Sequence, residues 1–96
     1  MEKASFSRHG KDFQEKLSKL MFEDRAFCSQ ISEVLDINFF ELSYLQLFVK
    51  KILLYKEKYD SHPNISSMTT MLRTDLASES PLMQKQVRDY YKRILT

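Results

Sequence analysis

The longest amphipathic stretch of the chain, LSYLQLFVKKILLYKEKY at residues 42–59, limits the fold more than any other feature. At about 100° per residue, its apolar side chains fill an arc wider than an ordinary core-facing stripe. They are Leu42, Tyr44, Leu45, Phe48, Val49, Ile52, Leu53, Tyr55 and Tyr59. A helix this apolar normally has neighbours on several sides. We therefore expect a long central helix with the shorter elements packed around it.

The opposite side of this helix is mostly polar but carries two leucines. Leu47 and Leu54 are seven residues apart, about two helical turns, so they lie on one line beside Lys50 and Lys51. A single core packed against the apolar arc does not explain two leucines on the other side of the helix. They predict either an interface with a partner or cover by another helix of the same domain, and the sequence leaves both open.

Helix-capping side chains precede apolar residues at three- and four-residue spacing in four other places. We expect helices to begin near Asp12, at Asp24, at Ser66 or Ser67, and at Ser80-Pro81. On the last of these helices, Asp89 and Arg93 are spaced for an ion pair. The inward-facing residues are expected to be Phe13, Leu17, Leu20 and Met21; Phe27, Ile31, Val34 and Leu35; Met68, Met71, Leu72 and Leu76; and Met83, Val87, Tyr90 and Ile94.

The segment DINFF at residues 36–40 interrupts the helical pattern. Adjacent Phe39 and Phe40 cannot both point into the same core, so one is expected to anchor the turn. The other is expected to be partly exposed, or both are buried across two packing layers. Phe40 is also a candidate contact for a partner, with Leu47, Lys50, Lys51 and Leu54.

No segment alternates with period two for long enough to predict a strand. The fold class is therefore all-α: a compact orthogonal bundle of five or six helices in one domain over residues 12–96, after a loose segment 1–11. Ninety-six residues suit one such domain.

The sequence shows no catalytic or ligand-binding motif, because residues of the types that enzymes use do not stand at the spacing that such a site requires. The lone Gly10 cannot form a phosphate-binding loop, and His9, His62 and Cys28 are far apart in the sequence. We expect no cofactor, no metal and no catalytic activity in this segment. Without an apolar run resembling a signal peptide or a membrane span, and with one cysteine, the chain is expected to be cytoplasmic.

The net charge of +2 does not by itself predict a nucleic-acid-binding protein, but the positive charge is concentrated in the second half of the chain. Residues 49–96 hold nine Lys and Arg against five Asp and Glu. A solvated helix face is the simpler interpretation. The candidate nucleic-acid contacts are Lys56, Lys58, Lys85, Arg88, Lys92 and Arg93.

The order of features from residue 13 to residue 76 resembles the N-terminal domain of DnaB-family replicative helicases, most closely the bacteriophage members. The matching stretches are LSKLMFEDRAFC at 17–28, VLDINFF at 34–40, the aromatic helix at 42–59 and HPNISSMTTML at 62–72. Bacterial members commonly have a His-Arg pair after the Phe-Tyr element. Tyr44-Leu45 stands there in this chain, so a contact made by that pair is not carried over.

This resemblance implies a collar domain that associates with its own copies and recruits primase and other replisome proteins during DNA replication. It also implies that the full-length protein is an ATP-dependent DNA helicase, in the cytoplasm of a bacterial host if phage-encoded. A close alternative is the helicase-binding end of a primase, whose helical subdomain resembles the same fold. A small basic DNA-binding protein is the alternative from another class. A Walker-type ATPase encoded after Thr96 would identify the helicase.

Overall fold

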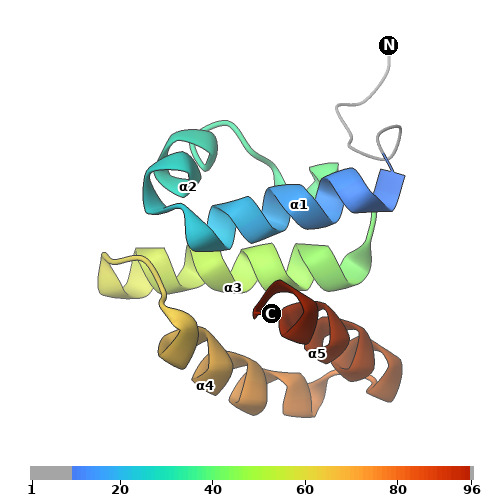
Figure 1. Ribbon diagram of the computed structural model, residues 1–96. Coiled ribbons are helices and arrows are strands. Elements are labelled where there is room, and N and C mark those ends of the chain that lie inside the picture. Colours follow the sequence, from blue (N-terminus) through green and yellow to red (C-terminus); the bar gives the residue numbers. More distant parts are fainter. Residues whose placement is uncertain (1–9, 96) are drawn as a thin grey trace.

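The computed structural model describes residues 10–95 and consists of helices joined by short turns (Figure 1). The elements are α1 (Gly10–Glu23), α2 (Arg25–Ile31), the 3-10 helix η2 (Ile37–Phe39), α3 (Ser43–Tyr59), α4 (Ile65–Asp75), the 3-10 helix η3 (Leu76–Ser78) and α5 (Pro81–Leu95). No strand occurs between residues 10 and 95, and the prediction of a compact all-α fold is confirmed. The expected loose segment lies outside the described residues, except that Gly10 and Lys11 already belong to α1.

Side-chain caps start α2, α4 and α5, whereas α3 starts after Leu42 without one, and two of the predicted caps are confirmed. Asp24 accepts a hydrogen bond from the Phe27 amide at 2.9 Å, and Ser80 accepts one from the Met83 amide at 3.1 Å. Helix α4 starts earlier than expected, because Asn64 accepts from the Ser67 amide at 2.8 Å and serves as its cap. The predicted cap at Ser66 or Ser67 is therefore wrong.

Helices α1 and α3 lie side by side and run in the same direction, because α2 and the segment after it carry the chain back (Figure 1). The two ends of α1 fix this register. Near its start, the Gln14 side chain accepts a hydrogen bond from the Glu41 amide at 2.9 Å, just before α3. At its end, the Phe22 carbonyl accepts one from His62 at 2.7 Å, just after α3. Helix α3 also packs against α4 and α5.

The core is built around Phe48 of α3, which is fully buried. Its ring lies 5.7 Å from Phe22 of α1, 5.2 Å from Tyr90 of α5 and 6.1 Å from Tyr91 of α5, measured between centroids. The first two contacts are edge-to-face, the favourable geometry for aromatic pairs. One residue of α3 thus joins α1 to α5, and neighbouring buried residues of α3 extend the core: Leu45, Val49 and Ile52.

Helix α1 buries a different face from the one that its apolar residues predict. Phe13 and Leu20 are 40% and 41% exposed, whereas the polar residues Gln14 and Ser18 are buried beside Met21. The reason is that both polar side chains have hydrogen-bond partners on distant segments, which offset the cost of burial. The expected inward face of Phe13 and Leu20 is therefore wrong.

The residues after α2 also differ from the expectation. Val34 was expected to face inward but is 76% exposed, because α2 ends at Ile31 and a turn follows it. Leu35 is half-buried against the core. No helix between residues 10 and 95 is long and apolar enough to cross a membrane.

Candidate protein-interaction surface

The side of α3 that carries Leu47, Lys50, Lys51 and Leu54 faces outward, and we call it the α3 outer face. Leu54 is 44% exposed, while Leu47 is half-buried and packs partly against the core. Lys50 is exposed, and Lys51 forms an ion pair with Asp75 of α4 at 3.0 Å. The two leucines therefore differ: Leu54 is open to a partner, and Leu47 contributes to both the core and the surface.

A hollow of about 770 Å³ lies at the Leu47 end of this face, where the α2–α3 connection meets the start of α5. Leu47 and Lys50 line it from α3, and Met83 lines it from α5. Its other apolar lining residues are Leu35, Ile37 and Leu53. Leu82, which precedes Met83 in the sequence, is 66% exposed. This end of the face offers a partner an apolar depression with a lysine in its wall.

A second, smaller hollow of about 310 Å³ lies at the Leu54 end, between α3 and α4. Leu54, Tyr59 and Met71 line it, and Tyr59 is 54% exposed. The Tyr55 and Tyr59 rings lie 4.6 Å apart, and the Lys58 ammonium is 5.2 Å from the centre of the Tyr59 ring. Leu54 and Tyr59 are thus exposed beside the half-buried Met71, and tyrosine and methionine are enriched in protein interfaces.

Phe40 was predicted to contact a partner, but its side chain is fully buried. Its carbonyl accepts a hydrogen bond from the Gln46 side chain at 2.6 Å, which holds the turn against the start of α3. The neighbouring Phe39 is half-buried. Phe40 therefore anchors the turn, and its side chain is not accessible to a partner in this structure.

The cations predicted to contact nucleic acid lie on two helices, Lys56 and Lys58 on α3 and the other four on α5. Lys56 donates a hydrogen bond to the Ser29 hydroxyl of α2 at 2.9 Å. Lys85 pairs with Asp89 at 2.8 Å, and Arg93 pairs with Glu15 of α1 at 2.6 Å. Asp89 was expected to pair with Arg93, but its partner is Lys85. The remaining two on α5, Arg88 and Lys92, line a different hollow together with Arg73 of α4, which the sequence analysis did not select.

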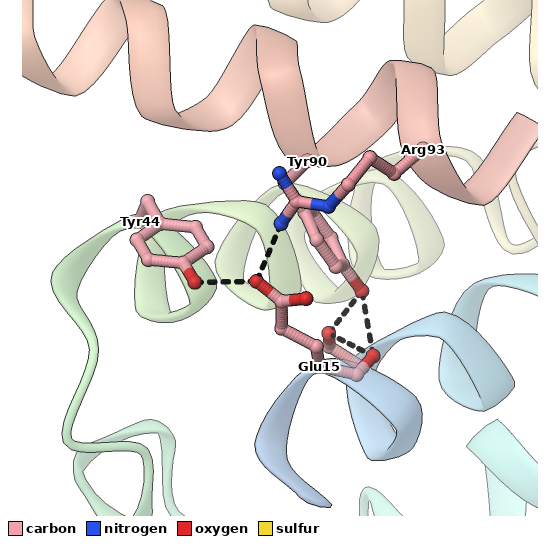
Figure 2. Close-up of polar contacts among 5 residues, drawn as sticks. Glu15, Tyr44, Tyr90 and Arg93 are labelled. Carbon is pink, nitrogen blue, oxygen red and sulfur yellow. Dashed lines mark hydrogen bonds and ion pairs between the residues drawn. The ribbon is translucent and has the colours of Figure 1, made fainter. Parts of the chain in front are cut away.

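Glu15 is the centre of a polar network that joins three helices and that the sequence analysis missed (Figure 2). Its carboxylate oxygen Oε2 accepts hydrogen bonds from the Tyr44 hydroxyl of α3 at 2.5 Å and from the Arg93 guanidinium of α5 at 2.6 Å. Its main-chain carbonyl accepts one from the Tyr90 hydroxyl at 2.8 Å. The Ser18 hydroxyl contacts both that carbonyl and the Tyr90 hydroxyl.

The network changes the ionisation of its two tyrosines. Burial is the main cause that raises the pKa of Tyr44 and of Tyr90 above the usual range, and for Tyr44 the hydrogen bond to Glu15 adds to it. Both phenols therefore remain neutral hydrogen-bond donors well into the alkaline range. We assign this network the role of holding α5 against α1 and α3.

His62 and Cys28 occupy structural positions. The His62 Nε2–H donates to the Phe22 carbonyl, since a carbonyl only accepts, and Nδ1 has no hydrogen-bond partner among residues 10–95. Cys28 is fully buried in α2, and this burial raises the pKa of its thiol despite the opposing charge of Lys56. Among the residues that the structure describes, no three His, Cys, Asp or Glu side chains are placed to hold a metal ion. His9 lies outside the described part of the chain.

No protein family, curated protein or solved structure that was compared with the chain matches it.

Proposed function

We propose that this chain is a non-catalytic protein-interaction domain that binds its own copies and recruits primase, as the collar domain of a DnaB-type replicative helicase does. Two lines of argument support the proposal. The first is the resemblance of the stretches at 17–28, 34–40, 42–59 and 62–72 to that domain. The second is the exposed apolar surface on α3, which is independent of the resemblance.

The observation that carries the proposal is the exposure of Leu54 together with Tyr59. Both lie in the hollow between α3 and α4 and would lose contact with water when a partner covers it. Because Leu54 is already partly covered, completing its burial would contribute on the order of 1 kcal/mol, less than a fully exposed leucine would. Several such residues together are needed for a stable complex, and the hollow at Leu47 supplies more of them.

The finer parts of the proposal concern architecture and location. We propose an orthogonal bundle in which α3 is the central helix, a view supported by the contacts of α3 with α1, α4 and α5. We also place the domain in the cytoplasm, that of a bacterial host if the gene belongs to a phage.

The alternatives explain less of the surface. A DNA-binding protein needs cations that are free to contact phosphates along a backbone, and here Lys56, Lys85 and Arg93 each contact another side chain of the domain. The helicase-binding end of a primase would use the same kind of apolar surface. A primase catalytic region encoded before this segment distinguishes it from a helicase, whose motor follows.

Replacing Leu54 by Asp tests the proposed interface. We expect the wild type to self-associate with rising concentration in sedimentation equilibrium, and Leu54→Asp to weaken the association about tenfold or more, because a buried unpaired carboxylate is unfavourable. Leu20→Asp is the matched control, since Leu20 is 41% exposed on α1. It should associate as the wild type does, and all three proteins should have the same helical circular dichroism spectrum.

The double variant Leu47→Asp/Leu54→Asp extends the test to the other hollow. Because Leu47 packs partly against the core, this variant is interpreted only alongside its thermal unfolding curve. A wild type that remains monomeric at every concentration contradicts self-association. Equal weakening by Leu20→Asp and Leu54→Asp contradicts the choice of the α3 outer face.

A further inference from the structure

A third hollow, of about 450 Å³, lies between α4, η3 and α5, and its lining combines an apolar floor with a cationic rim. The floor consists of Leu72, Leu76 and the Tyr91 ring. The rim carries Arg73 near the end of α4 and Arg88 and Lys92 of α5. Within residues 10–95, no carboxylate lines this hollow. It shares none of its lining residues with the hollows of the α3 outer face.

The floor is held in place by the core. Leu72, Leu76 and Tyr91 are each less than a tenth exposed. The Tyr91 hydroxyl donates to the Ile65 carbonyl at 3.0 Å and contacts the Thr69 hydroxyl at 2.9 Å, which ties α5 to the start of α4. The shape of the hollow is therefore present before any ligand binds. Little free energy is lost in reorganising these side chains when a ligand binds.

The rim arginines keep their charge available. Neither Arg73 nor Arg88 forms an ion pair with another of the residues 10–95. The carboxylates nearest in sequence are engaged elsewhere: Asp75 with Lys51 at 3.0 Å and Asp89 with Lys85 at 2.8 Å. Two arginines that have no acidic partner in the described part of the chain lie beside one apolar depression. They form a surface that attracts carboxylates, which the guanidinium binds with two parallel hydrogen bonds.

We propose that this hollow binds a short acidic segment of a partner protein, which places an aliphatic side chain on the floor and carboxylates against Arg73 and Arg88. The floor favours an aliphatic side chain over a nucleobase, because its one aromatic ring, Tyr91, is only 8% exposed and leaves little of its face for a base to stack on. The cations also surround a single depression, whereas a nucleic-acid strand requires cations that follow a line. This inference concerns a different face from the proposed self-association surface and does not depend on it.

Selection from a library of short randomised peptides tests the inference, with the whole chain as bait. We expect enrichment of peptides in which Asp or Glu flanks Leu, Ile or Met. By fluorescence anisotropy, the selected peptides should bind Arg73→Glu/Arg88→Glu about tenfold more weakly, as the loss of two exposed charge pairs predicts. The matched control is Lys16→Glu/Arg25→Glu, which changes the net charge equally at exposed residues outside the hollows and should bind as the wild type does.

Three further measurements decide the outcome. Peptides with Lys in place of each acidic residue should bind Arg73→Glu/Arg88→Glu better than the wild type. Ala77→Phe, which fills the hollow without changing charge, should weaken binding even if the charge-reversed variant does not fold. Leu54→Asp should leave peptide binding unchanged. Failure of the peptide-binding inference is therefore distinguishable from failure of the proposed interface on the α3 outer face.

The inference is overturned if the library yields no acidic consensus, or if its peptides bind all variants equally. It is also overturned if a labelled single-stranded oligonucleotide binds at this hollow, loses affinity in Arg73→Glu/Arg88→Glu and is not displaced by the acidic peptides.

Discussion

The carboxylate of Glu15 accepts hydrogen bonds from two helices that are far from it in sequence, through Tyr44 of α3 and Arg93 of α5. Its side chain is 17% exposed and the Arg93 side chain is 51% exposed, so water screens part of the ion pair. Screening lowers the contribution of the charges themselves. The hydrogen bond from the buried Tyr44 is less affected, because Tyr44 is only 7% exposed.

At this residue scale, we expect Glu15→Gln to lower the free energy of unfolding by about 1–2 kcal/mol. The amide keeps one oxygen as acceptor, but it brings an N–H₂ donor against two groups that are themselves donors. Urea denaturation measures the difference. Glu33→Gln is the control, since Glu33 is exposed and forms no ion pair among residues 10–95, and it should change stability by less than about 0.5 kcal/mol. Equal effects of the two substitutions would contradict a role for the network.

At the scale of the element, the start of α4 depends on the side chain of Asn64. Pro63 is buried immediately before it, which positions the chain so that the Asn64 oxygen reaches the Ser67 amide. Ser66 was the alternative cap by sequence, but it lies within the first turn and is exposed. A helix of 11 residues depends on such caps more than a long helix does.

The two possible caps of α4 are distinguished by their alanine variants. Asn64→Ala should lower the free energy of unfolding by about 1 kcal/mol, because the Ser67 amide loses its side-chain acceptor. Ser66→Ala should leave stability nearly unchanged. Thermal unfolding followed by circular dichroism measures both. The opposite ranking would place the start of the helix at Ser66.

At the scale of the whole molecule, Tyr44 and Tyr90 couple the packing of α1, α3 and α5 to pH. Tyr90 is fully buried, and the Tyr44 and Tyr90 rings lie 6.0 Å apart. Burial raises the pKa of both phenols in the folded state. In the unfolded chain a tyrosine loses its proton near pH 10. The unfolded state therefore binds fewer protons than the folded state above that pH, and ionisation favours unfolding.

We expect stability to be unaffected by these groups below about pH 10 and to fall as the pH rises further, by up to about 1.4 kcal/mol per pH unit for each tyrosine. Unfolding by urea at a series of alkaline pH values measures this slope. Tyr44→Phe/Tyr90→Phe should be less stable at neutral pH, because it loses hydrogen bonds, but should show a shallower alkaline decline. A decline as steep as that of the wild type would exclude these two tyrosines as its cause.

Local pattern was sufficient to predict several elements of this protein. Helical periodicity predicted α3 over 42–59, and the structure has it at Ser43–Tyr59. Asp24 and Ser80 were identified as caps from residue type and position alone. These features depend on neighbours within one or two turns, which is the range that a sequence pattern reports. The exposure of Leu54 also agrees with its place on a polar helix face.

Only the tertiary structure decided which face of α1 is buried and which charges remain available. Gln14 and Ser18 are buried because their partners come from Glu41 and Tyr90, and Arg93 is engaged by Glu15, 78 residues away. Within residues 10–95, Arg73 and Arg88 form no ion pair, and the nearby carboxylates of Asp75 and Asp89 pair with Lys51 and Lys85. Hydrophobic periodicity is a local property and was determined by the sequence itself, whereas hydrogen bonds and ion pairs between distant helices exist only once the fold brings their atoms within reach.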